Sequence, residues 1–544
     1  MRLKTAVLSI VTLSAAVSGA TYVLLIAPAP PLNFDEAAHS LPGYYVLRDL
    51  LALDMRALWG DFHIQTLWPP GFSLLQAPFL AMLGRSDESA RAFALIMLVC
   101  AALMSFVLAG QIKRSTAAVA GWVSALIALS APGWLFVGSW AMQETPVAFV
   151  VFASFAAVLR AWRTAQLAWY LLSGLSLYFL FLTKYNYAAF AVAAVGMVDL
   201  LRRVQQRRVQ RSALLWQRHA LELAALYVPL IAGVVFWFFG GTDIVPTEVK
   251  WRDFRFFVTN EDSGYPFWSA ENLLFYVRVM LEWLMPSPFL AIAAVLGAVW
   301  AVVRLRHAGV WLLAVFFSLG FVLATVHQLK APRYITPLFP SLWLLCGLGT
   351  ADLLWLAKVR LRQQRAARDA LIPGALGLCF LGALWSWVTW LPRLEPVWAG
   401  NAAADLRSAA QQIVQWQRGD RPVLIIGTFG ELSPPLFEWR LRPLPAFANT
   451  PHPIQYDAPP VEGENDLARV QRWLAMHPTA QVTVIRVDES SPLYQTQDMH
   501  QKNAWRQALA RQFESVASHR LVHARDYPRS GIHIAYYLPA EGQR

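Results

Sequence analysis

The chain has 544 residues, of which 57% are hydrophobic and 15% charged, with 24 tryptophans. This composition is too apolar for a soluble globular protein and predicts a polytopic membrane protein. The net charge of +12 would suggest nucleic-acid binding in a soluble chain. Here the basic residues lie in short connections between apolar segments, which indicates membrane topology and no nucleic-acid partner.

Apolar segments near the roughly 20 residues that a membrane-spanning helix requires recur along residues 1–391. We predict about eleven transmembrane helices. Their approximate positions are 5–27, 90–110, 116–137, 145–161, 167–183, 186–201, 221–240, 289–304, 309–326, 335–355 and 370–391. The first segment follows Arg2 and Lys4 and stays apolar through "YVLLIAPAP", which favours an uncleaved anchor over a signal peptide.

The basic residues fall in alternate connections. With the N-terminus in the cytoplasm, every cytoplasmic connection is basic, as the positive-inside rule requires. These connections carry Lys113, Arg114, Arg160, Arg163, Arg202, Arg203, Arg207, Arg208, Arg211, Arg218, Arg304, Arg306, Lys358, Arg360, Arg362, Arg365 and Arg368. Loops 28–89 and 241–288 and the tail then lie on the extracytoplasmic, or periplasmic, side.

Charged residues on this outer side lie close to span ends. The segment "PLNFDEAAHS" sets Asp35 and Glu36 just after the first span, and short outer connections carry Lys184, Lys330 and Arg333. Each cation alone is equally well explained as an anchor that reaches the lipid headgroups. Three cations on the same side as two acids favour an anion-binding site.

The outer loops also contain segments typical of helices on a membrane surface. Residues 44–59, 71–83 and 271–286 are too polar or too short to span, yet rich in leucine and aromatic residues. We expect them to cover a cavity at the outer leaflet. Glu144, in "GSWAMQETPVAF", either complements the dipole of the helix that it begins or joins the two other acids.

Residues 392–544 are expected to form a separate soluble α/β domain outside the membrane. Predicted helices at 401–417, 466–477 and 503–513 alternate with predicted strands at 423–427, 481–487, 520–524 and 532–538. The segment "GTFGELSPP" lacks the spacing and the lysine of a phosphate-binding loop. No catalytic constellation is recognisable in this domain.

Five motifs in order carry a resemblance to a known family. They are the Asp-Glu pair after the first span, "WPPG" before the second, "QETP" after the third, "TKYN" after the fifth and "KAPRYITPLFP" at the start of a late span. Together they resemble the lipid-carrier-dependent glycosyltransferases of the GT-C superfamily, of family 39 type, which groups protein O-mannosyltransferases with the aminoarabinose transferase. The resemblance covers roughly residues 1–350.

The resemblance implies transfer of a hexosyl or pentosyl group from a polyprenyl phosphate donor to a lipid, glycan or protein acceptor at the outer face of the cell membrane. Asp35 is then expected to be the general base that takes a proton from the acceptor. The donor phosphate is expected to bind a group of residues on the outer side. This group is Lys184, Lys330, Arg333 and Tyr334.

Glu36 and Glu144 are expected either to orient the acceptor or to bind a divalent cation, if the enzyme uses one. No metal site is predicted, because His39 and His63 are isolated and have no ligand spacing. The sequence does not identify a cofactor.

Two alternatives stay open. A ligase or polymerase of polyprenyl-linked glycans would share the outer site and differ in its acceptor. A transporter or flippase of lipid-linked sugars would need ionisable residues near the bilayer midplane. The acids Asp199, Glu222 and Asp352 fall near span ends instead, and no internal repeat is evident.

Overall fold

The computed structural model describes residues 3–66, 69–209, 213–259, 268–285, 287–327, 330–361, 365–398, 401–417, 421–426, 432, 434–441, 454–456, 466–488, 508, 511, 513–514, 519–527 and 532–539. The chain divides into two compact units. The first contains Met1–Ile26 and Pro42–Pro392, and the second contains Ala27–Leu41 and Arg393–Arg544. Helix α2 (Phe34–Ala52) begins in the second unit and ends in the first.

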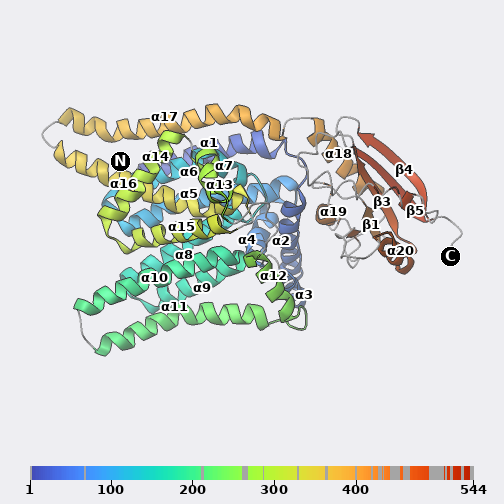
Figure 1. Ribbon diagram of the computed structural model, residues 1–544, viewed down its shortest axis with the longest axis horizontal. Helices are drawn as coiled ribbons and strands as arrows, with labels where there is room; N and C mark the ends of the chain where they lie inside the picture. The colour runs from blue at the N-terminus through green and yellow to red at the C-terminus, as the bar shows by residue number, and fades with distance from the viewer. Residues whose placement is uncertain are drawn as a thin grey trace. The chain divides into compact units, whose positions relative to one another are not determined.

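The first unit is a helical bundle (Figure 1). Its α-helices are α1 Leu3–Thr21, α3 Met55–His63, α4 Gly71–Leu83, α5 Asp87–Ile112, α6 Ala117–Ser130, α7 Pro132–Gly138, α8 Glu144–Thr164, α9 Leu167–Thr183, α10 Tyr185–Val209, α11 Ala213–Phe239, α12 Thr247–Thr259, α13 Ala270–Val279, α14 Pro288–Leu305, α15 Ala308–Val326, α16 Phe339–Arg360 and α17 Arg365–Trp398. π-Helical turns at Tyr22–Ile26 and Met280–Leu284 continue α1 and α13, and 3₁₀ turns at Arg114–Thr116 and Pro332–Leu338 precede α6 and α16.

The apolar segments predicted to span the membrane fall on helices of this bundle, and 167–183 matches α9 at both ends. The prediction of one helix at 116–137 is wrong, because the structure divides this segment between α6 and α7 at Ala131. Six helices of the described chain are long and apolar enough to cross a bilayer, or seven if α6 and α7, which meet at a 72° bend, form one span. The chain is therefore a multi-pass, mainly helical membrane protein. The figure of about eleven spans stays a prediction.

The predicted surface helix at 44–59 is wrong in one respect, because the structure divides it. Helix α2 ends at Ala52, and Leu53 takes the left-handed backbone conformation, with φ 54°. Asp54 then caps α3 by accepting hydrogen bonds from the backbone N–H groups of Arg56 and Ala57. The predicted segment 71–83 matches α4, and 271–286 corresponds to α13 and the π-helical turn that follows it.

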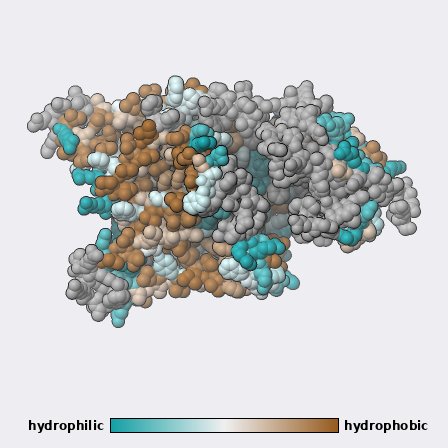
Figure 2. Space-filling view, viewed as in Figure 1, coloured by the Kyte–Doolittle hydropathy of each residue, from teal (hydrophilic) through white to brown (hydrophobic). Residues whose placement is uncertain are grey.

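Small residues allow the central helices to pack closely. A Cβ added at Gly349 of α16 would overlap the carbonyl oxygen of Gly297 in α14, and one added at Gly347 would overlap the carbonyl oxygen of Ala120 in α6. Glycine at these positions lets the backbones approach, as in other membrane helix pairs. Figure 2 shows hydrophobic side chains over much of the visible face of the helical bundle.

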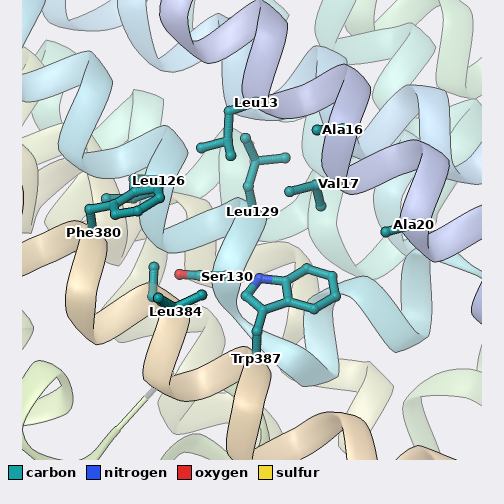
Figure 3. A pocket seen from close by; sticks show the side chains of 11 residues that line it. Leu13, Ala16, Val17, Ala20, Leu126, Leu129, Ser130, Phe380, Leu384 and Trp387 are labelled. Atoms are coloured by element: carbon teal, nitrogen blue, oxygen red, sulfur yellow. The ribbon is translucent and has the colours of Figure 1, made fainter.

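A crevice of about 220 Å³ lies between α1, α6 and α17 (Figure 3). Its lining is apolar apart from Ser130 and the Trp387 indole nitrogen. The Ser130 hydroxyl donates to the Ile127 carbonyl, and the Ser130 carbonyl accepts from Ser386. These bonds satisfy the polar groups of Ser130 within the protein.

The second unit contains a mixed sheet of five strands in the order β2-β1-β3-β5-β4. The strands are β1 Val423–Ile426, β2 Ile454–Tyr456, β3 Gln481–Val487, β4 His519–Tyr527 and β5 Ile532–Pro539, and the helices are α18 Asn401–Trp416, α19 Pro434–Leu441 and α20 Asp466–Met476. Strand β1 pairs in parallel with β2 and β3, whereas β5 is antiparallel to β3 and β4. The sequence predicted every strand except β2. Most of the predicted helix 503–513 lies outside the described residues.

Residues 27–41 group with the C-terminal part of the chain for a physical reason. The guanidinium of Arg407 in α18 donates to the carbonyl oxygens of Pro28 and Ala29, each at 2.8 Å. These charge-assisted bonds tie the segment after α1 to the second unit.

Candidate functional site

Two of the predicted site residues, Glu144 and Lys184, form a largely buried ion pair. Glu144 is the first residue of α8, and Lys184 follows α9. The Nζ atom of Lys184 donates to Oε1 of Glu144 at 2.8 Å, with the side chains 15% and 1% exposed respectively. Because a buried carboxylate is costly without a partner, Lys184 stabilises the charge of Glu144.

Two tyrosine rings surround this pair. The ammonium of Lys184 lies 5.7 Å from the ring centre of Tyr187 and 5.9 Å from that of Tyr334. The hydroxyl of Tyr187 donates to the Tyr334 carbonyl, which fixes the start of α10 against the 3₁₀ turn Pro332–Leu338. The structure therefore brings together Glu144, Lys184 and Tyr334.

Arg333 belongs to the same cluster. Its guanidinium lies 5.5 Å from the ring centre of Tyr334, and one of its nitrogens is 3.9 Å from Sδ of Met142. Met142 precedes α8 by two residues, so Arg333 lies beside the helix start that carries Glu144. The cluster combines two cations that occur in separate parts of the sequence.

Lys330 has different surroundings from the other two cations. Its Nζ atom donates to the carbonyl oxygens of Ala324 and Thr325, at 2.9 and 2.7 Å, and so caps the C-terminal end of α15. The ring centre of Tyr276, in α13, lies 4.9 Å from the ammonium. Burial lowers the pKa of Lys330 to about 8.

The paired acids Asp35 and Glu36 lie in the first turn of α2, within the second unit. Asn33 caps this helix by accepting a hydrogen bond from the backbone N–H of Glu36, and Oε2 of Glu36 accepts one from the backbone N–H of Asn33. This reciprocal pair has the geometry of a capping box. Glu36 is fully buried and Asp35 is partly exposed, so the two neighbours differ in their access to a substrate.

His63 takes part in a buried contact with a lysine that the sequence analysis missed. The Nζ atom of Lys250, which is fully buried in α12, lies 3.0 Å from Nδ1 of His63 and donates to the carbonyls of Trp237 and Gly240. Burial, and then the nearby ammonium, lower the pKa of His63 to about 4. The neutral imidazole therefore helps to hold α3 and α12 at the end of α11. Among the described residues, no three His, Cys, Asp or Glu side chains gather as a metal site would require.

Tyr187 and Tyr276 are the other residues that the sequence analysis missed. Tyr187 lies within "TKYNY", directly beside the predicted Lys184, whereas Tyr276 lies in the segment predicted only as a surface helix. Proximity in sequence could have indicated the first. The contact of the second with Lys330 joins residues far apart in the chain.

A family model matches part of the chain. Residues 68–237, which include Glu144 and Lys184, match the family model of dolichyl-phosphate-mannose-protein mannosyltransferase. The match covers less than half of the chain. No curated protein sequence matches it.

Solved structures are similar over almost the whole chain. ArnT from Cupriavidus metallidurans in the apo state has 16% sequence identity and a TM-score of 0.58, and the similarity covers 97% of each chain. The same protein bound to undecaprenyl phosphate has 16% identity and a TM-score of 0.57, with the same coverage. The archaeal oligosaccharyltransferase AglB from Archaeoglobus fulgidus has 11% identity and a TM-score of 0.51, over 99% of this chain and 74% of that one.

These similarities define the fold as the GT-C type of polytopic membrane protein. The fold shared with ArnT, and the family model that matches residues 68–237, agree with the resemblance that the ordered motifs carry.

Proposed function

We propose that the protein is a membrane glycosyltransferase that moves a sugar from a polyprenyl phosphate donor to a lipid, glycan or protein acceptor at the outer face of the membrane. The observation that supports this most is the cluster in which Lys184 and Arg333 lie around Tyr334 beside Glu144. Similar proteins provide further support. ArnT is described with bound undecaprenyl phosphate, and AglB with a dolichol-phosphate and an inhibitory peptide.

In the proposed reaction, an acceptor oxygen attacks the anomeric carbon of the sugar. The bond from that carbon to the phosphate oxygen breaks, and the electron pair leaves with the polyprenyl phosphate. The proton of the acceptor passes to the carboxylate of Asp35, which we propose as the general base. Asp35 is the better candidate of the two adjacent acids because Glu36 is fully buried and uses one carboxylate oxygen to cap α2.

The cations would stabilise the negative charge that develops on the leaving phosphate. Arg333 has a planar guanidinium that suits two phosphate oxygens at once. The Lys184 ammonium already forms an ion pair with the Glu144 carboxylate, with 2.8 Å between Nζ and Oε1. A phosphate that approaches would therefore compete with Glu144 for this ammonium. We propose that Glu144 keeps Lys184 in position and that Lys330 and Tyr334 complete the phosphate site.

The alternative of a transporter loses support from the surroundings of three acids. Arg203 forms ion pairs with both Asp199 and Glu222, and Lys113 pairs with Asp352. Each acid is therefore neutralised by a cation near the end of a helix. An ion-coupled transporter would instead use ionisable groups that face a pathway near the midplane.

The direct test is a binding and transfer assay on the purified, monodisperse protein. Undecaprenyl phosphate is the probe for binding, and a panel of polyprenyl phosphate sugars is the probe for transfer. Arg333→Ala should weaken binding of undecaprenyl phosphate, because it removes a charge-assisted contact with the phosphate. Arg218→Ala is the matched control, because the Arg218 side chain in α11 is 57% exposed and pairs with Glu222.

Equal affinity of the parent protein and a folded Arg333→Ala variant would contradict the phosphate site. If the protein transfers no sugar from any polyprenyl phosphate sugar but does transfer a glycan from a polyprenyl-linked oligosaccharide, the result would favour the glycan ligase.

A further inference from the structure

Tyr276 is the only described tyrosine whose ring faces the Lys330 ammonium, with 4.9 Å between ring centre and nitrogen. From this geometry we propose that Tyr276 is a positioning residue, which holds Lys330 in place and protonated for the phosphate of a polyprenyl-linked ligand. The inference rests on the proposed function, which assigns Lys330 to that phosphate. Tyr276 itself would touch no reacting atom and would act through the lysine.

The hydrogen bonds of Lys330 leave capacity for an anion. A lysine ammonium has three N–H donors. Two of them are directed to the carbonyl oxygens of Ala324 and Thr325 in the last turn of α15. Among the described residues, no third acceptor is bonded to Nζ, so one N–H can serve a phosphate oxygen while the other two fix the position of the nitrogen.

The position of Tyr276 on its helix supports a role directed inward. Ser269 caps α13 by accepting from the backbone N–H of Asn272. Asn272, Tyr276 and Val279 are the buried residues of this helix, at spacings of four and three. They form one face, and Tyr276, which is 1% exposed, is the aromatic residue on it.

Lys330 is the cation of the three that most needs such support. Glu144 balances the charge of Lys184 at 2.8 Å, and an arginine such as Arg333 stays charged at any ordinary pH. Burial lowers the pKa of Lys330 to about 8, so its charge is easily lost. The negative face of an aromatic ring favours the charged form, and it does so more strongly where water is excluded.

The test uses ring electronics at unchanged shape in the full-length protein. Position 276 is substituted with phenylalanine and with 3,4,5-trifluorophenylalanine, which differ little in size but strongly in the charge on the ring face. Two quantities are measured: the pH dependence of Lys330 acetylation by mass spectrometry, which reports its pKa, and the affinity for undecaprenyl phosphate.

Tyr276→Phe keeps the ring but loses the hydrogen bond between the tyrosine hydroxyl and the Ala331 backbone, so it is the reference for the fluorinated ring. The fluorinated ring should shift the acetylation curve of Lys330 to lower pH and weaken undecaprenyl phosphate binding by about two- to thirtyfold, the range of a cation–π contact. Tyr276→Leu should change both quantities in the same direction. The control is the same substitution at Tyr170, a fully buried tyrosine of α9 that accepts from Arg202, which should leave Lys330 unchanged.

Identical Lys330 acetylation curves for the phenylalanine and trifluorophenylalanine proteins would overturn the inference. A shifted curve with unchanged affinity, in a protein whose Arg333→Ala variant does lose affinity, would also overturn it, because Lys330 would then not serve the phosphate. A shifted curve in a protein that binds no undecaprenyl phosphate at all would leave the contact standing and reject the proposed function instead.

Discussion

At the scale of single residues, each of the three cations predicted to lie on the outer side lies over a tyrosine ring. Lys184 and Arg333 share Tyr334, and Lys330 has Tyr276. The sequence could indicate the cations, because charge in a short outer connection departs from the expected pattern. It could not indicate their aromatic partners, because tyrosine is common at membrane interfaces and only the three-dimensional contact distinguishes these rings.

The difference between Asp35 and Glu36 leads to a prediction about catalysis. Asp35→Asn keeps size and most hydrogen bonding but cannot take a proton, so turnover should fall by about 10²–10⁴, with little change in stability. Glu36→Gln keeps an oxygen that can accept from the Asn33 backbone N–H, so its effect should be milder. The measurement is the transfer rate of purified variants. Parental turnover of Asp35→Asn would exclude Asp35 as the base.

The pKa of Lys330, lowered to about 8 by burial, predicts opposite effects of pH on binding and on stability. Phosphate binding needs the ammonium, so affinity for undecaprenyl phosphate should fall as the pH rises through about 8. The unfolded chain binds this proton more tightly than the folded one, so this group makes the fold more stable as the pH rises from about 8 toward about 10.5.

Titration of affinity and of thermal unfolding on the same samples separates the two effects. Lys330→Arg should flatten the decrease in affinity, because arginine does not titrate in this range. A decrease of the same size in this variant would show that another group is responsible.

At the scale of elements, periodicity and length predicted the positions of helices well, because apolar segments in a bilayer have few alternatives to helix. They failed where one residue decides the local path. The left-handed Leu53 and the cap at Asp54 divide the predicted helix 44–59. Strand β2 has three residues and owes its conformation to pairing with β1, a contact that its own sequence does not encode.

Close packing of α14 against α16 gives a prediction at this scale. Gly349→Val would force a branched side chain against the Gly297 carbonyl, so the helices must separate. We expect a loss of stability of about 1–3 kcal/mol or more, as for overpacked cores. Thermal unfolding in detergent measures it. Gly377→Val is the control, since a Cβ added at Gly377 in α17 meets nothing within 4 Å; equal melting temperatures for the two variants would contradict the packing.

At the scale of the whole molecule, the sequence indicated a helical membrane part followed by a smaller α/β part. It gave no sign that residues 27–41 group with the C-terminal part, because that grouping depends on bonds from Arg407 to backbone carbonyls nearly 380 residues away. Backbone carbonyls are present at every residue, so no sequence pattern marks the ones that a distant arginine will use.

The distribution of basic residues predicts the orientation of the chain in the membrane. Positive charge in short loops is retained in the cytoplasm, so a reporter fused after residue 210 or 362, within the basic connections, should behave as cytoplasmic. A reporter fused after residue 60, 260 or 544 should behave as exported. Since Asp35 and the cations belong to the exported connections, this result would put the proposed base and phosphate site in the leaflet that faces away from the cytoplasm. A cytoplasmic reporter at residue 544 would invert the topology, and the proposed transfer would then have to occur on the inner side.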